Sequence, residues 1–402
     1  MQASTTASTT AAGTERIQDV RSGFQIEAGL SQFLDFARWV SAAIVLLVHV
    51  NNRVTVRLGG TIDGATLPQI AWGFVCGFGH HAVVVFFVLS GFLIGSKVVR
   101  DLAEDRLDTR RYLIARVSRI HLVLIPALFL TLVLDAIGSH FDKAIYTISQ
   151  PGSFIGNVFM LQGFTTEPFG SDAPLGTLAN EFWYYMIFPL LAVGVWKRRP
   201  IFVVLPAAIM IAMTMIQPWH GVGFVLWLIG ALAGSVAPRE VSKRTQIFAV
   251  ILFIVLLVAL RLGIRLEQYT LAVVAVTDIA VASAFGLVLF CLRRNAFFDL
   301  GAFTKVNTQF AGFSYSLYAI HAPIVMLLCA VCVSLTGFGW KSPITQPWQW
   351  AIVGSMLTIP LLAAYLFSRA TEAKTDVVRA WLSALGIRLL RTWRSGGPAP
   401  QG

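Results

Sequence analysis

Arg38 and His49 stand eleven residues apart in the first long apolar run of the chain. Eleven helical residues make about three turns, so both side chains face the same side of one helix, about 16 Å apart along its axis. A guanidinium and an imidazole inside a membrane span are costly, and they indicate a functional site. An imidazole can act as a general base near neutral pH, and a guanidinium can bind phosphate. Alternatively, Arg38 snorkels to the membrane interface and His49 is a packed, hydrogen-bonded histidine.

Polar residues also occupy the first half of the apolar run at 178–196, where Asn180, Glu181, Tyr184 and Tyr185 lie close together. An isolated carboxylate in hydrocarbon is too costly, so Glu181 is expected to be paired, protonated or in contact with water. A belt of interfacial aromatic residues would explain the tyrosines without any function. It would not explain Glu181, which is therefore a candidate site residue.

The run at 311–334 contains Ser314, Tyr318 and His321. Ser314 and His321 are seven residues apart and share one helix face, with Tyr318 one turn before the histidine. These three residues are candidates for a site, although a lone histidine in a span is often structural.

Two further patterns lie in the segments at 73–95 and 110–126. Arg116 and Arg119 are one turn apart at a basic helix start. Membrane topology alone would explain these charges, but the pair also suits the phosphates of a nucleotide-bearing ligand. Ser90 and Gly91 are small residues that allow two helices to approach closely.

The composition is that of an integral membrane protein. Of 402 residues, 56% are hydrophobic and 13% are charged, and the mean hydropathy is +0.72. These values exclude an ordinary soluble globular domain. Apolar runs long enough to cross a bilayer predict about ten transmembrane helices in an all-α fold. They are centred on 34–52, 73–95, 116–137, 178–196, 201–216, 221–237, 246–262, 270–292, 311–334 and 349–368.

The formal net charge of +11 could suggest a nucleic-acid partner, but the basic residues gather in alternate loops. This is the positive-inside pattern of a membrane protein, and we expect no nucleic-acid binding. With both termini in the cytoplasm, 25 of the 31 Lys and Arg residues lie inside. The exceptions are Arg53, Arg57, Lys143, Arg261, Arg265 and Lys341. We therefore predict that both termini are cytoplasmic.

The four cysteines, Cys76, Cys291, Cys329 and Cys332, lie within or beside apolar runs. Thiols at that depth are usually packing residues, so neither a disulfide nor a metal site is expected. The C-x-x-C spacing of Cys329 and Cys332 leaves a redox role as a minor alternative. The longest external loop, at 138–175, contains a short apolar segment that is either re-entrant or a cap over an external cavity.

Taken together, these motifs resemble the acyltransferase family 3 membrane proteins. The resemblance rests on the Arg38-x10-His49 pattern, FFVLSGFLI at 86–94, the Arg116/Arg119 segment followed by Pro126, NEFWYYMIFP at 180–189 and SYSLYAIHAP at 314–323. It extends over residues 31–370 in the same order. Two departures mark a subgroup, since many members have an aspartate at the position of Val84 and a Trp-Ser pair at Gly176 and Thr177.

The resemblance implies transfer of an acyl group, most often acetyl from cytoplasmic acetyl-CoA, to a hydroxyl at the outer face of the bacterial inner membrane. The acceptor would be a cell-surface or exported glycan such as a polysaccharide, lipopolysaccharide or nodulation factor. His49 and Glu181 would be the catalytic residues, and Arg38, Arg116 and Arg119 would bind the donor. Supporting residues would be Ser90, Asn180, Tyr184, Ser314, Tyr318 and His321. Acyl-CoA is a substrate in this reaction, so no permanently bound cofactor or metal is expected.

The chain is then expected to divide into a disordered cytoplasmic segment at residues 1–30, a ten-helix acyltransferase domain at residues 31–370, and a basic cytoplasmic tail at residues 371–402. In the tail, 376–394 has the pattern of an interfacial amphipathic helix that binds membrane lipid. Polysaccharide-synthesis machinery is a possible protein partner.

Two functions of other classes remain as alternatives. A transporter or flippase of a lipid-linked or acidic glycan would also carry intramembrane His, Arg and Glu residues. The sequence lacks the inverted repeats and the matched broken helices of many transporters. A passive sensor or scaffold would give no reason for Arg38, His49 and Glu181 to occur together.

Overall fold

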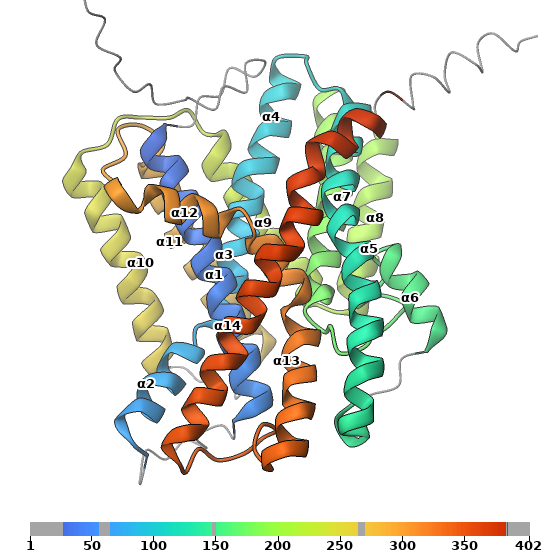
Figure 1. Cartoon of the computed structure of the whole chain (residues 1–402). Coiled ribbons are helices and arrows are strands. Elements are labelled where there is room, and N and C mark those ends of the chain that lie inside the picture. Colours follow the sequence, from blue (N-terminus) through green and yellow to red (C-terminus); the bar gives the residue numbers. More distant parts are fainter. Residues whose placement is uncertain (1–26, 56–64, 147–149, 264–269, 383, 385–402) are drawn as a thin grey trace, which may run out of the picture.

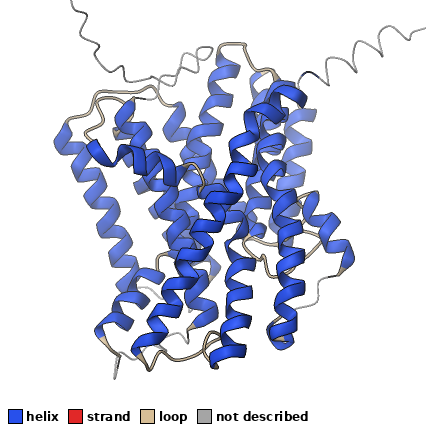
Figure 2. Ribbon diagram, in the orientation of Figure 1, coloured by secondary structure: helices blue, strands red, loops and turns tan. Residues whose placement is uncertain are grey.

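The computed structural model describes residues 27–55, 65–146, 150–263, 270–382 and 384. Within these residues the regular elements are helices (Figure 2), and eight helices are long and apolar enough to cross a membrane. Two shorter apolar helices, α8 (Ile201–Ile216) and α9 (Trp219–Ser235), account for the remaining two predicted runs. The prediction of an all-α integral membrane protein is therefore confirmed.

The first half of the bundle consists of α1 (Ala28–Val54), α2 (Leu67–Cys76), α3 (Gly79–Ser90), a π-helical turn η1 (Gly91–Gly95), α4 (Ser96–Ala103), α5 (Thr109–Phe141), α6 (Pro151–Val158) and α7 (Leu175–Trp196). After α8 and α9 the second half contains α10 (Lys243–Gly263), α11 (Leu271–Cys291), α12 (Thr304–Ala311), α13 (Ser314–Thr336) and α14 (Pro347–Ala370). Short 3-10 turns lie at Lys143–Ile145, Gly301–Phe303 and Glu372–Lys374.

Two helical segments are longer than the apolar runs predicted. The run at 73–95 belongs to an almost continuous helical segment from Leu67 to Ala103, and α5 contains 33 residues. The apolar pattern missed the extensions at 96–103 and 109–115 because those ends contain charged residues. Asp108 starts α5 by accepting a hydrogen bond from the backbone N–H of Arg111 (3.0 Å), a helix N-cap that places basic residues in the first turns.

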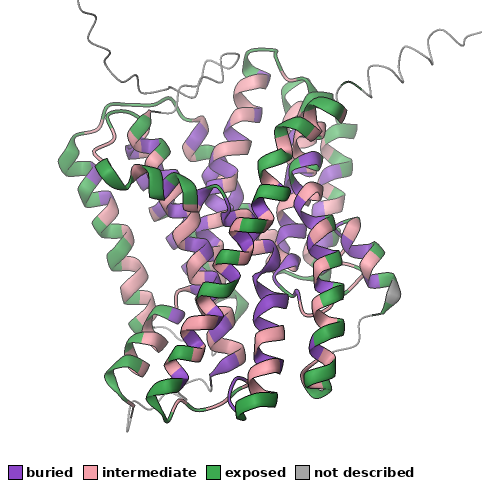
Figure 3. Ribbon diagram, viewed as in Figure 1, coloured by how far each residue is buried: buried purple, intermediate pink, exposed green. Residues whose placement is uncertain are grey.

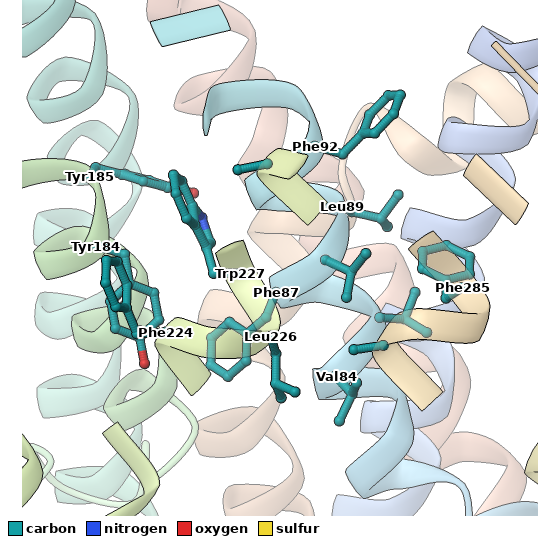
Figure 4. Close-up of a cluster of buried hydrophobic side chains, with 14 of the residues drawn as sticks. Val84, Phe87, Leu89, Phe92, Tyr184, Tyr185, Phe224, Leu226, Trp227 and Phe285 are labelled. Atoms are coloured by element: carbon teal, nitrogen blue, oxygen red, sulfur yellow. The ribbon is translucent and has the colours of Figure 1, made fainter. Parts of the chain in front are cut away.

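Glycines allow the segment α3–η1 to cross α9 with their backbones in contact. A Cβ atom at Gly91 would overlap the carbonyl oxygen of Trp227, and one at Gly230 would overlap that of Val88. Small residues of this kind let membrane helices pack closely. Beside the crossing, aromatic side chains of α3, α7 and α9 fill the interior (Figure 4), and Trp227 and Phe87 are almost fully buried there.

The start of α1 and the end of α14 lie at the same end of the bundle, the upper end in Figure 1. An even number of membrane crossings requires this arrangement. Which side of the membrane that end faces remains the prediction made from the distribution of basic residues.

The segment after α5 folds back along the bundle. In α6, Phe154 packs on Phe129 of α5, with ring centroids 5.2 Å apart. The carbonyl oxygen of Val158, at the end of α6, is 3.0 Å from Nε2 of His121, twenty residues before the end of α5. The short apolar segment therefore lies beside the middle of α5 (Figure 1), and both a re-entrant segment and a cap remain predictions.

The outer helices of the bundle carry many exposed residues (Figure 3), and large apolar side chains are among them. In α10, for example, Ile251, Ile254 and Val255 are each more than half exposed. Such a surface is suited to lipid and unsuited to water.

Several predictions fall outside the described residues. They concern residues 1–26, Arg57 and Arg265, and the part of the tail that holds Leu385, Leu389, Arg388, Arg391 and Arg394. The four cysteines are free thiols.

Candidate functional site

A cavity of about 610 Å³ lies between α3, α4, α5, α7 and α13. This volume is within the range of about 300–1,000 Å³ that is usual for sites of small molecules. Its lining includes seven of the residues singled out in the sequence: Arg38, Ser90, Arg116, Arg119, Glu181, Ser314 and Tyr318. The fold thus brings together side chains from five separate motifs.

The cavity has a charged end where α4 meets α5, at the upper end of the bundle in Figure 1. Its lining there includes Lys97, Arg106 and Arg111, together with Asp101 and Asp108. Lys97 is paired with Asp101 at 2.9 Å. From Arg111 the lining continues to Ile120, a distance of about 14 Å along α5.

Arg116 and Arg119 lie deeper along the same face of α5 and form no ion pair with a described residue. The guanidinium of Arg116 lies 5.8 Å from the ring centroid of Tyr112, and its Nε atom is buried without a hydrogen-bond partner. Arg38 differs, because Asp35 lies 3.4 Å away. Two guanidinium groups that face one cavity can bind phosphate or carboxylate oxygens, so this pair suits an anionic ligand.

A chain of hydrogen bonds crosses the wall of the cavity between α9, α3 and α7. Trp227 donates from Nε1 to Oγ of Ser90 (3.0 Å), and Ser90 Oγ is 2.7 Å from the hydroxyl of Tyr185. Tyr185 in turn donates to Oε2 of Glu181 at 3.4 Å. Because the indole can only donate and Tyr185 donates to Glu181, the hydroxyl of Ser90 donates to Tyr185. The chain therefore ends on the carboxyl group of Glu181.

Tyr318 is a cavity residue whose ring contacts one of the two histidines of the sequence motifs. Its hydroxyl donates to the carbonyl of Pro174 (2.7 Å) and contacts the hydroxyl of Thr177, which also lines the cavity. The ring centroid of Tyr318 is 6.1 Å from that of His321, and the centroid of His321 is 5.0 Å from that of His49. The histidine pair is therefore outside the cavity lining and adjoins it through Tyr318.

The structure does not bring Tyr184 and Asn180 to the cavity. The Tyr184 hydroxyl donates to the carbonyl of His220 (2.8 Å), and its ring packs on Phe87 and Phe224 in the apolar interior (Figure 4). Asn180 is buried outside the lining, with its Oδ1 unpartnered. Tyr185, the neighbour of Tyr184, occupies the cavity wall instead.

Arg53 belongs to a polar cluster that the sequence motifs did not include. It lies one turn after His49 on α1, donates from one nitrogen to the carbonyl of Ser171 (2.9 Å), and leaves the other buried without a partner. Asp135 accepts hydrogen bonds from the backbone N–H (2.8 Å) and hydroxyl (2.6 Å) of Ser171. The spacing of Arg53 from His49, one helical turn, could have identified Arg53 as a site residue. No pattern in the sequence pointed to Ser171, which lies in a loop.

Asp172 completes this cluster next to Ser171, and its side chain is fully buried. Burial raises the pKa of the Asp172 carboxyl well above its ordinary value, and the positive charge of Arg53 opposes this shift. Of the described residues, no group of three or more His, Cys, Asp or Glu side chains is placed to hold a metal ion.

Comparison with known proteins gives a family match over almost the whole membrane domain. A family model described as an acyltransferase domain matches residues 31–369. A protein of Haemophilus influenzae, described as uncharacterized, is 28% identical over 123 residues, which cover 28% of this chain and 49% of that protein. The chain thus spans about half the length of this curated relative. No solved structure matches the chain.

Proposed function

The chain belongs to acyltransferase family 3, and on that premise we propose that it transfers an acetyl group from cytoplasmic acetyl-CoA to a hydroxyl of a glycan. The acceptor is a cell-surface or exported glycan at the outer face of the bacterial inner membrane. Acyl-CoA, the glycan and membrane lipid are then the partners of the protein.

The observation that carries the proposal is a pair of arginines in the cavity, Arg116 and Arg119, that form no ion pair with any residue that the structure describes. Coenzyme A carries a diphosphate and a 3′-phosphate at one end and a thin pantetheine arm at the other. The basic end of the cavity suits the phosphates, because guanidinium groups bind phosphate oxygens with charge-assisted hydrogen bonds. The aromatic interior suits the arm, whose thioester would then lie near Tyr318.

In this reaction the oxygen of the acceptor hydroxyl bonds to the thioester carbonyl carbon, and the carbon–sulfur bond breaks. His49 takes the hydroxyl proton and returns it to the departing thiolate, so no proton is gained or lost overall. A positioned base of this kind contributes about 10²–10⁴-fold to a rate. Transfer through an acyl-histidine is the other route open to the same residue.

The acyl end of the donor must pass Tyr318 to meet His49. Rotation of the Tyr318 side chain would break its hydrogen bond to the carbonyl of Pro174. This rotation would connect the cavity to the histidine pair. Glu181 ends the hydrogen-bonded chain through Ser90 and Tyr185 on the cavity side. Its role in the proposal is to support the acyl-transfer site from there.

The proposal is tested by thermal unfolding of the purified protein with acetyl-CoA, dephospho-CoA and S-acetylpantetheine. Acetyl-CoA at about 100 times its Kd should stabilise the protein by about 2.7 kcal/mol. Dephospho-CoA should stabilise less at equal concentration, and S-acetylpantetheine should have no effect. A folded protein that no coenzyme A derivative stabilises would contradict the proposal and favour a transporter.

A further inference from the structure

The imidazole of His321 has a fixed tautomer. His321 is 1% exposed, and its Nδ1 lies 2.9 Å from the carbonyl oxygens of both Leu317 and Tyr318. A carbonyl oxygen can only accept a hydrogen bond, so Nδ1 carries the hydrogen. In a neutral imidazole the other nitrogen, Nε2, is then a bare acceptor.

This acceptor has no partner in the described structure, although it is buried. Buried polar atoms are nearly always hydrogen bonded, so one left unpaired needs a physical reason. The ring of His49 is 5.0 Å away between centroids, at an interplanar angle of 57°. Neutral His49 has one N–H that it can donate to this acceptor. Hydrogen bonds between catalytic groups are often long until the substrates are bound, so this one would shorten in the complex.

His321 offers a bare acceptor beside the ring of His49, and the neighbouring polar groups differ from it. Arg53, one turn beyond His49, is a cation and can only donate. The hydroxyl of Tyr318 donates to the carbonyl of Pro174 and contacts the hydroxyl of Thr177, and no hydrogen bond joins it to His49 in the described structure. Asp172 belongs to the cluster around Ser171, where Thr131 donates to its Oδ2 (3.5 Å) and its Oδ1 is buried without a partner among the described residues.

We propose that His321 is a positioning residue for His49. Its bare Nε2 accepts the N–H of His49, which leaves the other nitrogen of His49 free to take the proton of the acceptor hydroxyl. His321 keeps its own proton on Nδ1 throughout and stabilises the imidazolium that His49 becomes. The inference rests on the proposed function, and it assigns to a neutral histidine the orienting task that a carboxylate has in a Ser-His-Asp triad.

Two substitutions separate this role from packing. The amide N–H of His321→Asn lies near the place of Nδ1 and can still donate to the carbonyls of the helix, but nothing remains at the position of Nε2. His321→Gln reaches that position with an oxygen that accepts. We expect kcat to fall by about 100-fold in the Asn variant, while the KM for acetyl-CoA changes less than about twofold. The Gln variant should recover at least about tenfold of that loss.

A double-mutant cycle shows whether His321 acts through His49. Adding His321→Asn to His49→Ala should lower the remaining rate no further, because two residues that act as a unit are not additive. His81→Asn is the matched control. His81 is also buried with both ring nitrogens unpartnered, but the ring it adjoins is that of His80. This control should keep the wild-type kcat.

Rates are expressed per acetyl-CoA-binding site, measured by equilibrium binding. If the Asn variant has fewer sites but an unchanged rate per site, His321 is structural and the proposal is overturned. Additive losses in the double mutant would overturn it as well. Failure of the proposed function looks different, because the wild type itself would then neither bind nor consume acetyl-CoA.

Discussion

Replacing Arg116 and Arg119 together with glutamine should weaken acetyl-CoA binding far more than it weakens the fold. Both side chains line the cavity, and neither forms an ion pair with a described residue whose loss would destabilise the protein. Arg119 is exposed, and Arg116 is only partly buried. Removing their charges relieves mutual repulsion on one helix face, since they are one turn apart.

The magnitude follows from the contacts that each arginine offers to phosphate. A hydrogen bond to a charged group contributes about 1.5–3 kcal/mol, so two arginines contribute about 3–6 kcal/mol to donor binding. Glutamine keeps a weaker donor at each position, which favours the lower end. Because 1.4 kcal/mol is about tenfold, Kd should rise by at least about 100-fold. The temperature of unfolding without ligand should stay within a few degrees of wild type.

Equilibrium binding of radiolabelled acetyl-CoA measures the effect, with Arg198→Gln/Arg199→Gln as the matched control. These two arginines are exposed, lie on the same predicted side of the membrane and are not part of the cavity lining. The control also loses two positive charges, so it reports what topology and general attraction contribute. Equal losses in both double variants, or an unchanged Kd, would refute the role of the cavity arginines.

Three other predictions test the membrane topology, the helix packing and the polar cluster that contains Arg53 and Asp172. A cysteine at Asp142 should react with a membrane-impermeant thiol reagent added outside intact cells, and one at Asp105 should not; the reverse pattern would overturn the orientation. Gly230→Ala should destabilise the protein by about 1–3 kcal/mol, because its Cβ would overlap a backbone carbonyl of α3, whereas Gly354→Ala, with nothing within 4 Å, should unfold as wild type does; equal stability would contradict the close crossing. Asp172→Asn should raise the unfolding temperature at pH 8 and raise it less at pH 5. Burial raises the pKa of this carboxyl in the folded state, so its contribution is fully present below about pH 4, the unfolded pKa, and is lost as the pH rises. A lower unfolding temperature at pH 8 would show instead that ionised Asp172 stabilises Arg53.

The helices could be predicted because a long uninterrupted apolar run is rare in a protein except where its helix crosses a membrane. Where the prediction fell short was at charged ends, as at the start of α5, since hydropathy stops before the helix does. The orientation stays a prediction from the basic residues of the loops, and the structure adds that the bundle starts and ends at one end (Figure 1).

The charges in the sequence predicted a site, since Arg38, Arg116, Arg119 and Glu181 are costly inside a membrane, and the structure places all four at one cavity. The uncharged residues of the same helices did not show in the sequence which of them would line the cavity. Tyr184 and Tyr185 are about 100° apart around α7, and only Tyr185 faces the cavity. A helix that is apolar on nearly every side does not show in its sequence which tyrosine points where.

Contacts between residues far apart in the sequence could not be predicted for a similar reason. His49 and His321 meet because α1 and α13 pack together, and neither motif contains that information. The cluster of Arg53, Asp135, Ser171 and Asp172 joins two helices to a loop. A loop carries no periodic pattern from which its partners can be inferred.

The most direct test of the central claim is turnover of radiolabelled acetyl-CoA by the purified protein in liposomes, with His49→Ala beside the wild type. We expect both proteins to bind acetyl-CoA, because His49 and His321 are not part of the cavity lining. Only the wild type should release coenzyme A and pass the acetyl group to a hydroxyl acceptor or to water. Full turnover by His49→Ala would contradict the account of the site, and a folded wild type that neither binds nor consumes acetyl-CoA would contradict the function.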